Sequence, residues 1–328
     1  MSTSTSRLDM KGIVSFTLIA YGLAWLIASP LWISGQGLRH PLALPLMAGM
    51  MFAPSIAALI VTRFISRPAE GVRAALGMRL GKGRRWGWYW LFAWLAVPLI
   101  ILASIMVGAA LGLITLDLAG FSGYRALLEQ AGAGATLEQL PIQALVLIQL
   151  ATAFGIAPLI NAIPALGEEL GWRGYLLPQL LPLGQWPALL ISGAIWGLWH
   201  APVILLGYNY PQHPQLGVLL MVGFCMIWGV IFGWLRLATG SVWPAMLAHA
   251  ALNGIAGATV LLLQAGTSYD TALAGPLGLA GWILPLLLIG LLAAAHRLPA
   301  RDAPDAERDL QGASPAAETG LLSGHDLR

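Results

Sequence analysis

Charged residues are scarce in this sequence: aspartate, glutamate, lysine and arginine make up only 9% of its 328 residues. Soluble domains carry about 25% charged residues, so this composition excludes an ordinary soluble domain. Cysteine is almost absent, and a single cysteine, Cys225, excludes a disulfide framework or a thiolate metal cluster within one chain. The formal net charge is only +3, and in so apolar a chain the basic residues report membrane orientation. We therefore expect no nucleic-acid partner.

Apolar residues dominate instead. They make up 58% of the chain, and the mean hydropathy is +0.77. Apolar runs of about 20 residues recur along nearly the whole length, which is what a hydrocarbon core roughly 30 Å thick requires of each spanning helix. We therefore predict an all-α fold, a polytopic transmembrane helical bundle of about eight helices within a lipid bilayer, with seven or nine as alternatives. The predicted spans are residues 13–34, 41–66, 87–114, 142–165, 187–206, 215–236, 241–264 and 275–295.

The basic residues predict the orientation of this bundle. With a cytoplasmic N-terminus, all of the 17 lysines and arginines except Arg39 and Arg125 fall on the cytoplasmic side. The positive-inside rule favours this arrangement, so we predict that both termini are cytoplasmic. The chain then divides into a cytoplasmic segment at 1–12, a transmembrane domain at 13–298 and a cytoplasmic tail at 299–328. The tail has too few large apolar residues to fold, and we expect it to be disordered.

Ionisable side chains at membrane depth are costly, so they mark functional sites by default. The first such cluster contains Glu168 and Glu169, two adjacent carboxylates that follow a long apolar run. On a helix Glu169 and Arg173 are four residues apart and can pair on one face. Glu168 points about 100° away and is left free. The structural alternative for this motif is an interfacial charge cluster that anchors a helix end.

Two histidines lie in later spans. His200 lies four residues after Trp196, hence on the same helix face, and His249 lies one turn before Asn253. A glutamate beside a histidine can deprotonate a water for attack on a carbonyl, and a histidine with an asparagine can stabilise the resulting oxyanion. The structural alternative, for either histidine taken alone, is a ring that hydrogen-bonds to a neighbouring carbonyl and has no catalytic role.

The polar segments can form one site only at a common depth. Glu168 is expected just past the inner end of the fourth span, whereas His249 lies about 8 residues, or roughly 12 Å, inside the seventh. Breaks at Pro158 and Pro164 would let the glutamate segment dip inward. We therefore expect one pocket in the cytoplasmic half of the bilayer.

These motifs resemble those of the CAAX prenyl endopeptidase and bacteriocin-processing membrane proteases, also called the CPBP or ABI family. The Glu-Glu-x-x-x-Arg motif begins at Glu168, the Phe-x-x-x-His motif ends at His200, and the His-x-x-x-Asn element begins at His249. In the second motif Trp196 replaces the phenylalanine, which affects pocket shape more than chemistry. The order and spacing of three motifs on separate helices make the resemblance specific.

The resemblance implies an intramembrane endopeptidase of the CAAX-prenyl-protease type, with a catalytic core at about 142–264. Its substrate would be a membrane-associated peptide or protein, and we expect the chain in a bacterial inner membrane. The implied catalytic residues are Glu168 and His200, which activate the water, His249 and Asn253, which hold the oxyanion, and Glu169 and Arg173, which shape the site.

Two versions of this chemistry stay open, because members of the family have been described both as metalloproteases and as glutamate-dependent enzymes without a metal. Glu168, His200 and His249 would make a three-ligand Zn²⁺ site with an open position for water. Against zinc, the sequence has no His-Glu-x-x-His helix, and Asn253 is a poor zinc ligand.

Two functions other than proteolysis remain as alternatives. A small-solute transporter would use the same intramembrane polar groups, but it should show repeat symmetry, and the first three predicted spans have almost no such groups. The second alternative is a non-catalytic membrane partner, such as an immunity or scaffold protein on a decayed protease fold. The motifs disfavour it, because every motif position except the phenylalanine is retained.

Overall fold

The computed structural model describes residues 8–81 and 86–298, and its regular structure is helical. The one β-type feature among the described residues is an isolated antiparallel bridge between Leu116 and Leu263. The predicted all-α fold is therefore confirmed. The predicted tail at 299–328 and most of the predicted N-terminal segment lie outside the described residues.

The N-terminal part of the chain forms three long helical segments and several short elements. The elements are α1 (Met10–Ile33), η1 (Gly37–Arg39), α2 (Ala43–Met50), α3 (Ala53–Val61), η2 (Thr62–Ser66), α4 (Val72–Ala75), α5 (Trp86–Leu91), η3 (Phe92–Ala96), α6 (Val97–Ala110), α7 (Ser122–Gln130) and α8 (Gly134–Gln139). Of these, η2 and η3 are π-helical and continue the helix before them without a break.

The C-terminal part is built in the same way. Its elements are α9 (Ile142–Phe154), α10 (Ile156–Glu169), η4 (Leu170–Leu176), α11 (Leu177–Leu180), η5 (Leu181–Leu183), α12 (Gln185–Trp199), α13 (Ala201–Ile204), α14 (Pro214–Thr239), α15 (Trp243–Ile255), α16 (Ala258–Leu262), η6 (Leu279–Trp282) and α17 (Ile283–Ala294). The turn between α14 and α15 is short because Gly240 ends α14 in the left-handed conformation, with φ of 64°.

Six helical segments within the described residues are long and apolar enough to cross a bilayer. They are Met10–Ile33, Ala43–Ser66, Trp86–Ala110, Ile142–Leu183, Pro214–Thr239 and Trp243–Leu262. The other two predicted spans coincide with shorter helical segments, α12 with α13 and η6 with α17. The number of membrane crossings and their orientation stay predictions.

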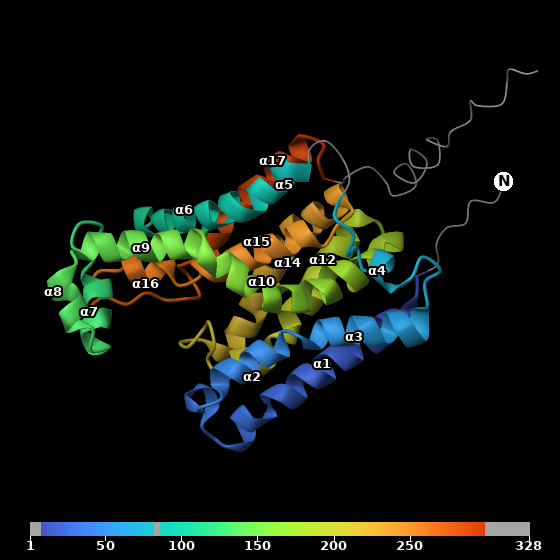
Figure 1. The fold of residues 1–328 in the computed structure, drawn as a ribbon, viewed down its shortest axis with the longest axis horizontal. Coiled ribbons are helices and arrows are strands. Elements are labelled where there is room, and N and C mark those ends of the chain that lie inside the picture. The colour runs from blue at the N-terminus through green and yellow to red at the C-terminus, as the bar shows by residue number, and fades with distance from the viewer. Residues whose placement is uncertain (1–7, 82–85, 299–328) are drawn as a thin grey trace, which may run out of the picture.

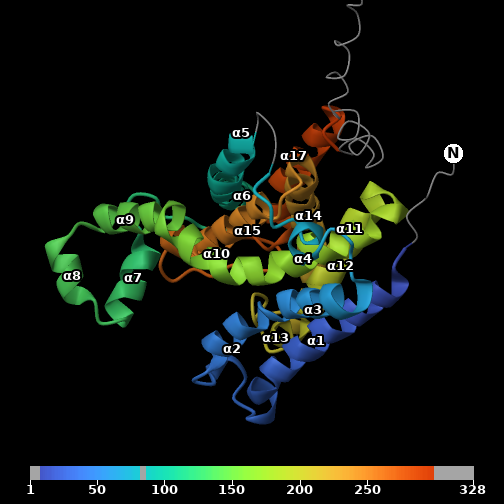
Figure 2. The same cartoon turned by 45° about the vertical axis from the view of Figure 1, so that its right-hand side comes forward.

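The helices form a bundle with a central group flanked on two sides. Helices α10, α12, α14 and α15 lie in the middle, α1, α2 and α3 lie on one side, and α5, α6 and α17 lie on the other (Figure 1 and Figure 2). Helices α7, α8 and α9 project together at one end of the molecule. The motif-bearing segments thus all belong to the central group.

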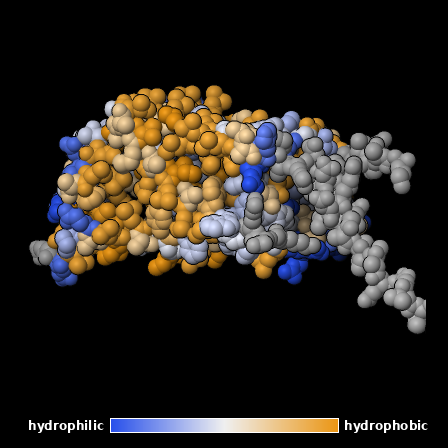
Figure 3. Space-filling view, turned by 90° about the horizontal axis from the view of Figure 1, so that it is seen from above, coloured by the Kyte–Doolittle hydropathy of each residue, from blue (hydrophilic) through white to orange (hydrophobic). Residues whose placement is uncertain are grey.

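The outer surface of the bundle is strongly apolar. Orange, apolar residues cover the middle of the face in Figure 3, and polar residues gather toward its ends. Leu18 is 68% exposed, and Leu147 and Ile163 are each 67% exposed. Water would disfavour so much apolar surface, whereas lipid tails accept it. The chain is an integral multi-pass membrane protein.

The fourth helical segment bends before its first proline. The break lies at Gly155, between α9 and α10, and Pro158 lies in the first turn of α10. Proline has no N–H, so Pro158 cannot bond to the Phe154 carbonyl four residues earlier; the Trp94 indole N–H binds that oxygen instead. Pro164 lies inside α10 and does not end it, so the second break expected from the sequence is absent.

Helices α12 and α14 pack at very short range because glycines line their contact. A Cβ atom at Gly193 would lie 2.6 Å from the Cα of Met226, and one at Gly197 would collide with the backbone of Val222. Small residues allow this approach, which is common between membrane helices. The contact fixes the rotation of α12 and hence the direction of Trp196, which lies three residues after Gly193 and directly before Gly197.

Candidate active site

Glu168 and Glu169 are the last two residues of α10, and the chain continues directly into the π-helical segment η4. Single π-helical turns within α-helices are frequent at functional sites. Both side chains are buried, at 2% and 0% exposure. At Gly171 the segment lies against Pro54 of α3, leaving no room for a Cβ atom. The two carboxylates therefore lie inside the bundle and do not form an interfacial anchor.

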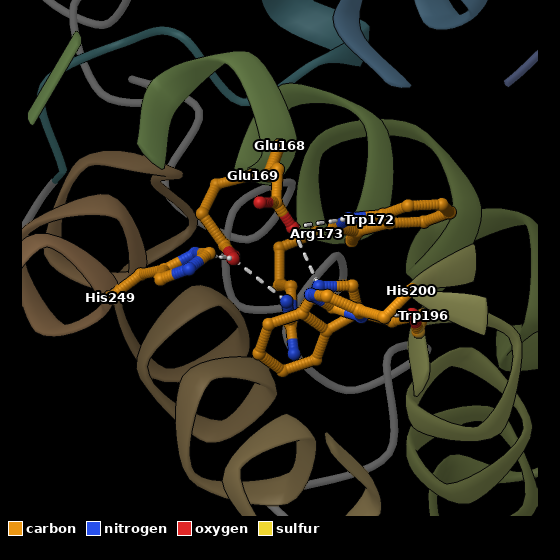
Figure 4. A network of polar contacts seen from close by, with 7 residues as sticks. All are labelled: Glu168, Glu169, Trp172, Arg173, Trp196, His200 and His249. Carbon is orange, nitrogen blue, oxygen red and sulfur yellow. Dashed lines mark hydrogen bonds and ion pairs between the residues drawn. The ribbon is translucent and has the colours of Figure 1, made fainter. Parts of the chain in front are cut away.

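Glu169 binds two partners through one oxygen. Its Oε1 lies 2.7 Å from Nη1 of Arg173 and 2.9 Å from Nδ1 of His249. The ion pair predicted from the i,i+4 spacing is confirmed, whereas the contact with His249 could not be predicted from spacing. In Figure 4 the Glu169 carboxylate points toward both partners. Glu169 thus connects α10, η4 and α15.

Aromatic rings enclose the cation of this cluster. The Arg173 guanidinium lies 4.3 Å from the centre of the Trp196 ring and 5.2 Å from that of Phe232. Phe232 also stacks on the His249 ring, with 5.6 Å between the ring centres. A cation over an aromatic face is attracted to the π-electrons, and burial strengthens this attraction. The arginine is thereby held between a carboxylate and two rings.

Glu168 has different neighbours. Its Oε2 accepts a hydrogen bond from Nε1 of Trp172 at 3.2 Å and a second from Nε1 of Trp196 at 2.6 Å, as Figure 4 shows. The sequence predicts that Glu168 is free of a cation partner, but it does not predict these two donors. The available signal was the tryptophan at the phenylalanine position of the second motif, because only the indole carries an N–H.

His200 lies at the C-terminal end of α12. Its Nδ1 is 3.0 Å from the backbone carbonyl of Trp196, and the Trp199 ring packs edge-on against it with 4.9 Å between ring centres. A carbonyl oxygen only accepts hydrogen bonds, so Nδ1 carries the proton, and Nε2 of a neutral His200 has a free lone pair. The carbonyl contact expected as the structural alternative is present and also fixes the tautomer.

These side chains adjoin a cavity of about 570 Å³. Sequence-predicted residues on its wall are Glu168, His200, His249 and Asn253, together with Trp196. Glu169 and Arg173 are not on the wall; they lie behind it, against His249 and Trp196. Three segments far apart in the sequence therefore meet at one cavity, and the six predicted residues separate into four that face it and two that support it.

The cavity extends beyond the polar cluster. It runs past methionines of α2 and α14 toward the connections at 205–213 and 264–278, where Tyr208 and Tyr269 line it. An ion pair joins these connections, because Nε2 of His213 lies 2.8 Å from the Asp270 carboxylate. That contact lowers the pKa of Asp270. The charge count predicts this end to be outside, and the depth of the site in the cytoplasmic half stays a prediction.

The predicted zinc ligands do not form a coordination shell in this structure. No three His, Cys, Asp or Glu side chains in the described part of the chain lie close enough together to hold a metal ion. The Nδ1 contacts of His200 and His249 leave Nε2 of both rings available to a metal, but Oε2 of Glu168 is occupied by two indoles. The arrangement does not fit Zn²⁺ without movement of these side chains, so no reaction step is assigned to a metal.

The comparison with protein families agrees with the motifs. Residues 144–255 match the family described as type II CAAX prenyl endopeptidase, Rce1-like. The matched region, about a third of the chain, contains all three motifs and confirms the family resemblance expected from them. A comparison with curated proteins found no match.

Proposed function

Starting from the Rce1-like domain at residues 144–255, a domain of a membrane endopeptidase family, we propose that this chain is an intramembrane endopeptidase with Glu168 as its general base. The observation that carries the proposal is the position of Glu168: it shares a cavity wall with His200, His249 and Asn253. Both indole donors bind Oε2, so Oε1 is the oxygen that can accept a proton from water.

His200 assists by orienting that water. Its Nδ1 proton is directed to the Trp196 carbonyl, so Nε2 of the neutral ring can accept a hydrogen bond from the water. A water bound to Glu168 and His200 loses one proton to Glu168 while its oxygen attacks the peptide carbonyl. The protonated Glu168 then transfers this proton to the leaving nitrogen as the C–N bond breaks, which balances the hydrolysis.

Asn253 and His249 supply the oxyanion pocket. The side-chain amide N–H of Asn253 is a hydrogen-bond donor in every protonation state of the site. His249 donates from Nε2 in its protonated form, in which Glu169 at Nδ1 is the counter-ion. Donors fixed before the reaction stabilise developing negative charge at little reorganisation cost. Arg173 holds Glu169 and therefore supports His249 without facing the cavity.

A metal-dependent version of this site stays an alternative proposal, since Glu168, His200 and His249 are the residues that would approach a zinc ion. Measuring zinc by mass spectrometry in the purified, active protein separates the two versions. Activity at far less than one metal per chain, unchanged by a chelator, supports the glutamate mechanism; activity proportional to bound zinc contradicts it.

For the substrate we propose a membrane-associated peptide or protein, and for the location a bacterial inner membrane. The apolar cavity supports this class, because an extended peptide leaving the bilayer would expose apolar side chains to it. The experiment compares the peptides in membranes that contain wild-type protein with those that contain Glu168→Gln or Glu168→Ala. Cleavage products that require wild-type Glu168 support proteolysis, and identical peptide sets would favour a transporter or a non-catalytic partner.

A further inference from the structure

The two indole donors on Glu168 come from different elements of the fold. Trp172 lies in η4, four residues after Glu168, whereas Trp196 lies in α12 and is 28 residues away. Both donate to the same oxygen, Oε2. An indole N–H can donate but cannot accept, so both contacts orient the carboxylate in the same way.

Trp196 is itself held rigidly in place. Its side chain is 2% exposed, the Arg173 guanidinium covers one ring face, and the His249 ring packs edge-on with 5.3 Å between ring centres. The Gly193 contact with α14 leaves little freedom for the helix that carries it. A donor fixed in this way does not reorganise during a reaction.

We infer that Trp196, assisted by Trp172, is the positioning residue for the catalytic carboxylate: its N–H fixes Oε2 so that Oε1 faces the water. This inference rests on the proposed function of Glu168. A phenylalanine, which the second family motif has at this position, would fill the space but could not make the hydrogen bond. The replacement by tryptophan therefore adds an anchor to the base of this chain.

The test removes the N–H and keeps the ring. Incorporation of 3-benzothienylalanine at position 196 replaces the indole N–H by sulfur with nearly unchanged shape. Since hydrogen bonds to charged groups contribute appreciably, kcat should fall about tenfold or more while KM changes by less than about twofold. The same replacement at Trp172, whose contact is longer, should give a smaller fall.

Trp90 of α5 provides the matched control. Its ring packs against that of Trp86 and does not line the cavity, and its buried Nε1 has no hydrogen-bond partner among the described residues. The same replacement there removes an N–H that makes no hydrogen bond and should leave kcat within about twofold. Equal effects at positions 196 and 90 would overturn the inference, because the loss would then not come from the hydrogen bond to Glu168.

A second measurement does not depend on turnover. The infrared carboxylate band of Glu168, isolated by subtracting the spectrum of Glu168→Gln, should shift when the N–H at position 196 is removed and should not shift when the N–H at position 90 is removed. If the band does not shift, or if kcat is unchanged by the replacement at position 196, the role of Trp196 is overturned. Provided that Glu168→Gln is inactive, the proposed role of Glu168 is untouched by that outcome. Full activity of Glu168→Gln would overturn the proposed function itself.

Discussion

The Glu169 carboxylate and the Arg173 guanidinium form an ion pair of 2.7 Å in which the two side chains are 0% and 1% exposed. A buried charge that loses its partner is destabilising by about 3–5 kcal/mol, because solvation cannot replace the interaction. The pair also determines the position of His249, which shares the same glutamate oxygen. Stability and activity should therefore change together when this pair is broken.

We predict that Glu169→Gln lowers both the Tm in detergent and the rate of cleavage. Arg173→Lys should lower both less, because lysine keeps the charge and the second arginine nitrogen, Nη2, has no partner among the described residues to lose. Thermal melts and peptide cleavage by purified protein measure the two effects. A Glu169→Gln protein with unchanged Tm would contradict the structural importance of the pair.

Glu168→Gln should behave differently. The amide keeps the shape of the side chain and can still accept the two indole N–H groups through its oxygen, but it cannot take a proton from water. Turnover should fall by at least about 10²-fold with the Tm preserved. Retained cleavage in Glu168→Gln, together with an inactive but stable Glu169→Gln, would mean that the two carboxylates have exchanged roles.

The sequence predicted the larger features of this molecule because they follow from local periodicity and composition. Apolar runs predicted the six long apolar segments and the two shorter ones that coincide with predicted spans, and the i,i+4 spacing predicted the ion pair of Glu169 with Arg173. The bend before Pro158 was predicted only approximately, because the position of a break depends on which donor satisfies the freed carbonyl. Here that donor is Trp94, which is distant in the sequence.

The contacts between helices could not be predicted in this way. The sequence shows that position 196 carries an indole N–H, but not that this N–H donates to Glu168, since the contact depends on the close packing of α12 and α14. The contact of His249 with Glu169 likewise depends on how α15 is rotated against α10. Sequence patterns identified the residues of the candidate site, and tertiary packing decides which of them face the cavity.

Orientation in the membrane can be tested by reporter fusions. The distribution of basic residues predicts that the connection containing Asp270 is outside and that the C-terminus is inside. Alkaline phosphatase fused after Asp270 should be active, and a reporter that works only in the cytoplasm should be active after Arg308. Phosphatase activity at the C-terminal fusion and none at the Asp270 fusion would reverse the predicted topology.

The pair of His213 and Asp270 predicts a small pH dependence of stability. Its hydrogen bond from His213 lowers the pKa of Asp270 in the folded protein, so the stabilisation is complete above the ordinary aspartate pKa. It is lost as the pH falls through the lowered value. Because both side chains are partly exposed, Asp270→Asn should cost less than about 1 kcal/mol near pH 6. Melts at several pH values should show the difference from wild type disappearing in acid.

The contact between α12 and α14 gives a prediction about the site that involves no polar residue. A Cβ at Gly193 would lie 2.6 Å from the Cα of Met226, and a backbone atom cannot move aside as a flexible side chain can. Gly193→Ala should therefore separate the two helices and displace Trp196 from Glu168. A displacement of about 1 Å at a catalytic group can cost on the order of 10²-fold in rate.

Gly22 of α1 is the matched control, because a Cβ there would meet no atom within 4 Å. Alanine has a higher helix propensity than glycine, by roughly 1 kcal/mol, so both substitutions gain the same contribution of helix propensity to stability. Gly22→Ala should keep or raise the Tm and leave cleavage unchanged, whereas Gly193→Ala should lower both. Since helix propensity favours the substitution at both positions, a loss confined to Gly193→Ala must come from the helix contact. Equal behaviour of the two variants would mean that the position of Trp196 does not depend on the contact between α12 and α14.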